Sequence, residues 1–507
     1  MKKIIFIPLD ERPCNYHFPS KLFDQEELNI VKPDISMMGN KKESGDTDKI
    51  AQWLLNEVKE ADGLVLSIDT LLYGGIVPSR LHHLSVDEIK SKLSILEDIK
   101  KVNPKLIIYA FHLIMRCPRY SSDDEEPSYY ETYGKEIFSL GYLNHRISLG
   151  LEKDESAKQK VIELENSIDK DALDDYLTRR KINLFANKMS IDYLKNNVID
   201  FLIVPQDDSA PYGYTAIDQE EIRKYIFETK QQLNAYMYPG ADEVGMTLIM
   251  RLLNQLNQRK PLIYVKYSST LADVVIPNYE DRILNESVKY QILASGGLLI
   301  DNIEMADIIL MINAPADYII GANQFFQRHQ GYTVKRNLVE FVEFIDYAIH
   351  VLKKPVAIGD VAFGNGSDIE LIQLLNDREL LMKLASYAAW NTSSNTLGTS
   401  IPQAMYYLLT QKINKSFLAL RYVEDAGYCG FVRQYVCDHD LEPLGFNYFD
   451  VKEKSGIASK IVQKRLETFV QEHLSTIEKN IKIKRCYMPW SRMFEVGLDV
   501  DYIENER

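Results

Sequence analysis

The sequence predicts an α/β fold with parallel strands, and three observations lead to this class. Short runs of β-branched and aliphatic residues recur along the 507 residues, each followed by Gly, Pro, Asp or Asn and then by a segment of helical period. Three prolines, Pro104, Pro261 and Pro355, stand between a helical segment and a strand, where a helix has to end. The hydrophobic content of 46% and the charged content of 26% are typical of a globular protein.

Eight of these runs form the expected set of strands, and eight strands predict a (β/α)8-like barrel. The runs cover residues 4–7, 63–68, 105–110, 201–204, 235–238, 262–265, 308–312 and 356–358. Residues 298–300 and 384–389 are further candidates, and ten strands fit two doubly wound parallel sheets equally well. The predicted class is therefore α/β, with one barrel or two sheets as the alternatives.

The predicted organisation is a catalytic domain over residues 1–425, followed by a C-terminal extension or cap over residues 426–507. Residues 120–197 interrupt the alternation, because they have helical period and many charged residues without a strand candidate. We interpret them as a helical insertion after the third strand. The acidic run at residues 123–126 is interpreted as a solvated loop within this insertion. The charged segments after residue 425 predict a helical extension.

The charge balance argues against nucleic acid as a partner, because 73 acidic and 59 basic residues give a formal net charge of −14. Five cysteines without a C-x-x-C pair are typical of reduced thiols in the cytoplasm. The apolar run that begins the chain ends at Asp10, which is too early for a signal peptide. No window reaches the roughly 20 apolar residues of a membrane helix. We therefore expect a cytoplasmic protein that does not bind a membrane.

Polar side chains follow the predicted strands, at the ends where parallel α/β folds place their chemistry. Turn and N-cap roles explain any one of these acids and amides, but they explain the coincidence at eight strand ends less well. The residues expected to bind a substrate are Asp10, Arg12, Asn15, Asp69, Tyr73, Arg80, His112, Arg116, Tyr212, Asp242, Asp360, Asn365, Trp390, Asn391 and Asn395.

A rim of carboxylates, amides and aromatic rings is suited to a sugar, which offers hydroxyl groups on its edge and weakly apolar C–H faces. Trp390 and the tyrosines would supply the aromatic platform. The three arginines at strand ends either pair with carboxylates or bind an anionic substrate such as a uronate or a sugar phosphate. His112 is either a sugar ligand or a core histidine. The predicted partner is a small-molecule carbohydrate.

The adjacent carboxyl groups of Asp207 and Asp208 are the predicted catalytic pair. Two neighbouring carboxylates in one closed pocket do not both ionise cheaply, so the pKa of one should rise and make it a proton donor at neutral pH. Glycoside hydrolysis needs such an acid beside a second carboxylate. Neighbouring residues on a regular strand point to opposite faces, so the pair shares a site only if the backbone bends there. Pro205 and Pro211, on either side, favour an irregular backbone.

An Asp-Asp pair after the fourth strand resembles the retaining hexosaminidases that use the substrate's 2-acetamido group as nucleophile. This resemblance covers the dipeptide, its position after the strand and the amides near Trp390. It implies that Asp207 orients the acetamido nitrogen and that Asp208 is the general acid and base. It also implies that Asn391 or Asn395 holds sugar hydroxyls or the acetamido group.

A second resemblance extends along nearly the whole chain. The segments at residues 8–15 and 73–80, together with the region of Trp390 and Asn391, resemble a bacterial family catalogued as domain of unknown function 4127. This likeness implies no particular activity. The functional prediction therefore depends on the strand-end residues.

The predicted function is a glycoside hydrolase that acts on small oligosaccharides, and two other functions are kept beside it. The acids at strand ends and His112 could hold Mg²⁺, Mn²⁺ or Zn²⁺ in a metal-dependent hydrolase or isomerase of a sugar phosphate or another small polar metabolite. These strand-end residues show no H-x-x-x-H, D-x-D or H-x-H spacing among themselves, so no metal is expected. A sugar-binding module without chemistry is the third possibility. No nucleotide fingerprint or G-x-S-x-G elbow occurs, so no cofactor is expected.

Overall fold

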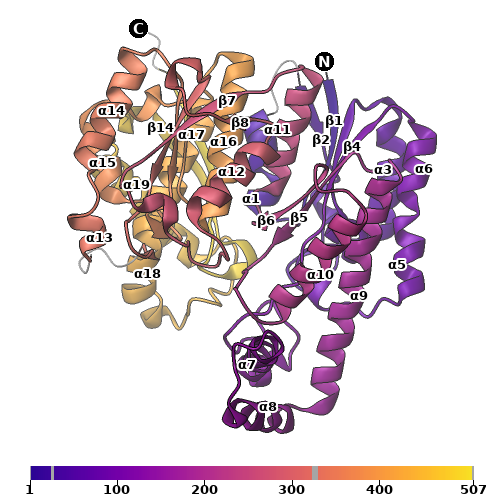
Figure 1. Cartoon of the computed structure of the whole chain (residues 1–507). Coiled ribbons are helices and arrows are strands. Elements are labelled where there is room, and N and C mark those ends of the chain that lie inside the picture. Colours follow the sequence, from indigo (N-terminus) through magenta and orange to yellow (C-terminus); the bar gives the residue numbers. More distant parts are fainter. Residues whose placement is uncertain (1, 24–27, 323–328, 505–507) are drawn as a thin grey trace. The chain divides into compact units, whose positions relative to one another are not determined.

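A computed structural model describes residues 2–23, 28–322 and 329–504 of the chain (Figure 1). These residues form two compact units. Unit 1 contains residues 1–11, 24–248 and 279–281, and unit 2 contains residues 12–23, 249–278 and 282–507. The predicted boundary at residue 425 does not coincide with this division, because residues 426–507 pack within unit 2.

Unit 1 is built on an open sheet of six parallel strands. Its first strand is buried toward its carboxyl end, as expected for an apolar run in a sheet covered on both faces. The strands, in spatial order, are β2 (Leu28–Val31), β1 (Lys2–Ile7), β3 (Gly63–Ser67), β4 (Ile107–Phe111), β5 (Phe201–Gln206) and β6 (Ala235–Pro239).

Unit 2 is built on a second open sheet, which has five parallel strands. Two short pieces, β10 (Ile320–Gly321) and β12 (Phe363–Gly364), pair separately from this sheet. The five strands, in spatial order, are β13 (Ser386–Ala388), β11 (Val356–Asp360), β9 (Ile308–Asn313), β7 (Leu262–Tyr267) and β8 (Leu298–Leu299).

The predicted α/β class is confirmed, and the strands divide between two open sheets as in the two-sheet alternative. All ten candidate runs contain strands. Within the six-stranded and five-stranded sheets, the strand that the sequence did not predict is β2, a four-residue run that has Asn29 at its second position. Numbered along the chain, both sheets begin with the order 2-1-3-4-5. In sheets of this order, ligands bind outside the carboxyl ends of the strands, where the strand order reverses.

The helices of unit 1 connect its parallel strands, and three of them form the predicted insertion (Figure 1). Residues 120–197 contain helices and no strand, which confirms the interpretation of this segment. The helices are α3 (Thr47–Glu57), α4 (Ile68–Tyr73), α5 (Val86–Leu93), α6 (Ile95–Val102), α7 (Tyr130–Ser148), α8 (Glu155–Ser167), α9 (Lys170–Lys195) and α10 (Tyr214–Glu228). The helix α11 (Val244–Leu256) begins in unit 1 and ends in unit 2.

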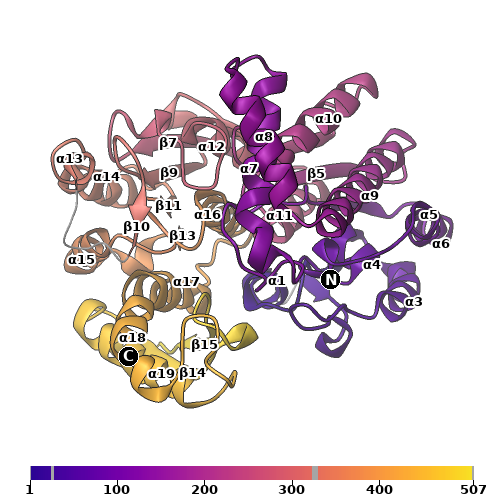
Figure 2. The same ribbon diagram turned by 90° about the horizontal axis from the view of Figure 1, so that it is seen from below.

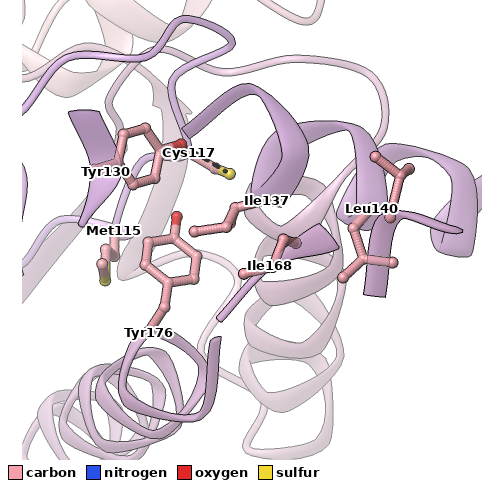
Figure 3. Packing of buried hydrophobic residues seen from close by; sticks show 8 residues of the cluster. Met115, Cys117, Tyr130, Ile137, Leu140, Ile168 and Tyr176 are labelled. Atoms are coloured by element: carbon pink, nitrogen blue, oxygen red, sulfur yellow. Dashed lines mark hydrogen bonds between the residues drawn. The ribbon is translucent and has the colours of Figure 1, made fainter. Parts of the chain in front are cut away.

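The insertion has a hydrophobic core of its own, which joins α7, α8 and α9 to the segment that follows β4 (Figure 3). Ile137 and Tyr176 are fully buried in this core, together with Met115 and Cys117 from the segment after β4. Because the same cluster contains residues on both sides of Arg116, packing of the insertion determines where that arginine lies.

The helices of unit 2 cover its sheet and continue into the predicted C-terminal extension. The extension is helical at first but ends in an antiparallel pair of strands, β14 (Ile481–Tyr487) and β15 (Gly497–Tyr502). Figure 2 shows this pair beside α19. The helices are α1 (Pro13–Tyr16), α2 (Phe18–Phe23), α12 (Leu284–Ala294), α13 (Gln330–Thr333), α14 (Leu338–His350), α15 (Ile369–Asp377), α16 (Ser393–Thr410), α17 (Lys415–Arg421), the π-helical η7 (Tyr422–Val432), α18 (Arg433–His439) and α19 (Ile457–His473).

Shortening a buried side chain in the core of the insertion should leave a cavity and lower the free energy of unfolding. Ile137→Ala removes a side chain that is 0% exposed and should lower the free energy of unfolding by about 2–5 kcal/mol. Phe227→Ala is the control, because Phe227 is 70% exposed and its loss should change stability by no more than about 0.5 kcal/mol. Urea unfolding followed by circular dichroism measures both variants. Equal stability of the two variants would contradict the described packing.

Candidate active site

The candidate site of unit 1 lies where its parallel strands end. Asp10 follows β1, Asp69 follows β3, Arg116 follows β4, and Asp207 and Asp208 follow β5. The strand order reverses between β1 and β3, so the first two acids stand at the switch point of this sheet.

The backbone bends at the predicted catalytic pair. The strand β5 ends at Gln206, and Asp208 has a φ of +43°, a left-handed conformation that is uncommon for a residue other than glycine. This bend removes the strict alternation of a strand. The expected departure from regular backbone is therefore present at the pair itself.

Two arginines bring the two aspartates into one ionic cluster. Arg80 Nη2 donates to Asp207 Oδ2 at 2.8 Å, and Arg116 Nη1 donates to Asp208 Oδ2 at 3.0 Å. Glu125 Oε2 lies 3.1 Å from both Arg80 Nη1 and Arg116 Nη2. Glu126 Oε1 lies 2.8 Å from Arg116 Nε and 3.3 Å from Arg80 Nη1. We call these residues the Arg80–Arg116 cluster: Arg80, Arg116, Glu125, Glu126, Asp207 and Asp208.

The long insertion helix α9 fixes the loop that carries Arg116. Tyr176 donates its hydroxyl to the carbonyl oxygen of Arg116 at 3.2 Å, and Arg180 Nη1 donates to the same oxygen at 3.0 Å. Arg180 Nη2 also donates to the carbonyl of Met115 at 2.9 Å. On the other side of the cluster, Asn183 Nδ2 donates to the carbonyl of Ser79, the neighbour of Arg80, at 2.9 Å. One helix therefore positions both guanidinium groups.

The carboxyl groups of Asp207 and Asp208 differ in their surroundings. The pKa of Asp208 is raised to about 6, first by burial of the carboxyl group and then by the negative charge of Asp207, while Arg116 and Arg80 oppose the rise. The side chains of Asp207 and Asp208 are 16% and 27% exposed. Among the described residues, no group donates to Oδ1 of either side chain. Each carboxyl group therefore has one oxygen without a donor from the described residues.

Glu125 and Glu126 are site residues that the sequence reasoning missed. The interpretation of the acidic run as a solvated loop is wrong for Glu126, which is 1% exposed, because both arginines need buried anionic partners. Asp123 does fit that interpretation, since it is 42% exposed and pairs with Lys42. The sequence feature that could have indicated these two residues is the presence of four adjacent acids together with arginines at two strand ends.

The other predicted residues of unit 1 have separate surroundings. His112 is buried and its Nδ1 lies 2.9 Å from Ser190 Oγ, and burial lowers the pKa of His112 to about 3, as for a core histidine. Tyr212 contacts the insertion, with its ring 5.0 Å from the guanidinium of Arg146. Asp10 and Asp242 are both buried at their strand ends.

Asp360 belongs to unit 2 and lies in a closed network at the carboxyl ends of that sheet's strands. Its Oδ1 accepts from Asn313 Nδ2 at 2.9 Å, and its Oδ2 accepts from the backbone N–H of Asp368 at 2.8 Å and from the Tyr387 hydroxyl at 3.0 Å. Arg336 pairs with Asp368 at 2.6 Å. Burial and the charge of Asp368 raise the pKa of Asp360 to about 7. Both oxygens of Asp360 are occupied by protein groups.

The predicted amides and the tryptophan of unit 2 follow β13 and β11. Trp390 is buried, with Nε1 donating to Thr399 Oγ1 at 3.0 Å, so its ring is part of the core. The backbone N–H of Asn365 donates to the carbonyl of Asn391 at 2.9 Å. Asn395 is buried, and its Oδ1 has no partner among the described residues.

Arg12 and Asn15 also belong to unit 2. Arg12 lies 3.8 Å from Glu495 and contacts the Trp490 ring, so it pairs with protein groups. Asn15 is buried in α1, where its Nδ2 lies 3.7 Å from Cys14 Sγ. Within residues 2–23, 28–322 and 329–504, no three His, Cys, Asp or Glu side chains are grouped so that they could hold a metal ion.

The fold and the cluster define an α/β protein with a carboxylate-rich site at the strand ends of its N-terminal sheet. The chain belongs to the family described as protein of unknown function DUF4127, whose model matches residues 4–499. This match confirms the predicted family along nearly the whole chain.

Two further comparisons gave no relatives. No curated protein and no solved structure matches the chain. In the part of the chain that the structure describes, no helix combines the length and the apolar character needed to cross a membrane.

The electrostatics of the cluster predict how the pKa of Asp208 responds to a neighbour. Glu125→Gln removes a negative charge that raises the pKa of Asp208, so the Asp208 carboxyl should titrate below pH 6 in this variant. Asp123→Asn is the control, because Asp123 lies in the same acidic run but pairs with Lys42. The measurement is a ¹³C NMR titration of labelled aspartate carboxyls, with the Asp208 signal assigned by its loss in Asp208→Asn. An Asp208 titration that is unchanged in Glu125→Gln would refute the cluster geometry.

Proposed function

We propose that the protein is a glycoside hydrolase that acts on small oligosaccharides, with its catalytic site at the Arg80–Arg116 cluster. The observation that carries this proposal is the convergence of Asp207 and Asp208 on one cluster, in which burial raises the pKa of Asp208. Asp208, whose pKa is raised to about 6, is suited to donate a proton to the leaving group. The second carboxylate is held beside it through Arg80 and Arg116.

The charge of the cluster supports a reaction in which positive charge develops. Two guanidinium groups face four carboxyl groups, so an excess of negative charge remains even when Asp208 is protonated. The transition state of glycoside hydrolysis resembles an oxocarbenium ion and is stabilised by such surroundings. An anionic substrate would be repelled, because both arginines are already paired with carboxylates. We therefore favour a neutral sugar over a uronate or a sugar phosphate.

The division of roles follows the retaining hexosaminidases that the pair resembles. In this proposal, Asp208 protonates the glycosidic oxygen and later accepts a proton from water. Asp207 orients the acetamido nitrogen of the substrate through Oδ1, the oxygen that Arg80 leaves unoccupied. The bond between the anomeric carbon and the leaving oxygen breaks while the acetamido oxygen bonds to the anomeric carbon. Water then opens this intermediate.

The test is hydrolysis of 4-nitrophenyl glycosides, including the N-acetyl-β-D-glucosaminide, by matched variants. Asp208→Asn should lower kcat/KM by about 10²- to 10⁴-fold, because it removes the proton donor and keeps the shape of the side chain. Asp123→Asn should match the wild type, because Asp123 is exposed and outside the cluster.

Two outcomes would count against this function. Failure of the wild type to hydrolyse any glycoside, or full activity of Asp208→Asn, would contradict it. Activity that is lost with EDTA and restored by Mg²⁺ or Mn²⁺ would instead support the metal-dependent hydrolase.

A further inference from the structure

The short helix α4 places two polar side chains at the switch point of unit 1. Asp69 and Tyr73 are four residues apart on this helix, so they lie on the same face. Both are buried, at 2% and 3% exposure. Ser67 caps the helix by accepting from the backbone N–H of Thr70 at 3.1 Å. The Thr70 hydroxyl donates to the carbonyls of Pro8 and Leu9, which directly follow β1. The position of the pair is therefore fixed by the strand ends.

The hydroxyl group of Tyr73 has no hydrogen-bond partner among the described residues. Its ring stacks on His82 at 4.3 Å and lies 6.4 Å from the ring of His112. Burial lowers the pKa of His82 to about 4 and that of His112 to about 3, so both rings are neutral at neutral pH. A buried hydroxyl without a partner is costly, and each such group calls for an explanation.

The carboxyl group of Asp69 can complement the Tyr73 hydroxyl as a hydrogen-bonding group. Its Oδ2 accepts from the backbone N–H of Leu113 at 3.0 Å. Burial raises the pKa of Asp69 to about 7, and Asp207 adds to this rise while the Leu113 N–H and Arg80 oppose it. The carboxyl group is thus partly protonated at neutral pH and offers both a donor and an acceptor.

We propose that Asp69 and Tyr73 together bind one hydroxyl group of the sugar, as an inner specificity determinant beside the Arg80–Arg116 cluster. This inference rests on the proposed glycoside hydrolase and names two residues that select its substrate. A sugar hydroxyl both donates and accepts, which matches a phenol and a neutral carboxylic acid. Asp69 is joined to the segment that carries Arg116, because it accepts from the backbone N–H of Leu113, three residues before that arginine.

The first test measures sugar binding without hydrolysis. Titration calorimetry at pH 6 with glucose, galactose and N-acetylglucosamine should show that at least one sugar binds the wild type. Tyr73→Phe should weaken that sugar's binding about tenfold, the effect of one lost hydrogen bond. Tyr193→Phe is the control, because Tyr193 lies on α9 outside the cluster and its substitution also removes one tyrosine hydroxyl. Absence of binding by all three sugars, or equal affinities of wild type and Tyr73→Phe, would overturn the inference.

The thermal midpoint of the same variants separates a ligand contact from a structural role. Without sugar, Tyr73→Phe should melt at the same temperature as the wild type or higher, because it removes a buried hydroxyl that has no partner. A lower midpoint with unchanged sugar binding would instead assign the hydroxyl to a buried water.

Asp69→Asn tests whether Asp69 binds the sugar hydroxyl as a neutral hydrogen-bonding group or needs an ionisable carboxyl group. The amide keeps a donor and an acceptor, so this variant should bind the sugar within about threefold of the wild type, whereas Asp69→Ala should not. Loss of binding in Asp69→Asn would overturn the proposed neutral role. Hydrolysis by the same proteins is scored separately, so a protein that binds sugar through this pair without cleaving glycosides refutes only the catalytic assignment.

Discussion

Two guanidinium groups shared among four carboxyl groups are the interaction on which the site of unit 1 depends. Arg80 and Arg116 are almost completely buried, and a buried charge is tolerated only when it is paired and hydrogen-bonded. Glu125 and Glu126 bridge the arginines, and Asp207 and Asp208 complete the arrangement with one carboxyl oxygen each. This constraint explains why the backbone leaves the strand geometry at Asp208 and why α9 has to hold the loop of Arg116.

The two units have the same strand order, but the acids at their strand ends differ in exposure and in their hydrogen bonds. In unit 2, Asp360 and Asp368 are fully enclosed and have protein donors on both carboxyl oxygens. In unit 1, Asp207 and Asp208 keep partial exposure and one unoccupied oxygen each. Pairing of all lone pairs stabilises a core, whereas unoccupied oxygens beside arginines are available to a ligand. This difference is the reason that we propose the chemistry for unit 1 and a structural role for the acids of unit 2.

Strand periodicity was sufficient to predict the α/β class and the acids that follow the strands, because Asp69, Asp207 and Asp208 are adjacent in sequence to apolar runs. The choice between one barrel and two sheets could not be made, since both contain the same alternation of strands and helices. The acidic run and the arginines at two strand ends hinted at Glu125 and Glu126, but their burial depends on how the insertion packs around Tyr176, which the strand pattern does not show. Trp390 is the type of residue that forms an aromatic platform for a sugar. In the structure, however, its indole is buried and donates a hydrogen bond to Thr399.

The dependence of hydrolysis on the leaving group tests the role of Asp208 most directly. In the proposed mechanism Asp208 protonates each leaving oxygen, so the wild type should cleave a series of aryl glycosides with phenols of increasing acidity with similar kcat/KM values. Asp208→Asn should lose progressively more kcat/KM as the phenol becomes less acidic, with the smallest loss on 2,4-dinitrophenyl glycosides, whose phenol is more acidic than 4-nitrophenol. A uniform loss of activity across the series, or no loss at all, would contradict the account of Asp208 as the proton donor.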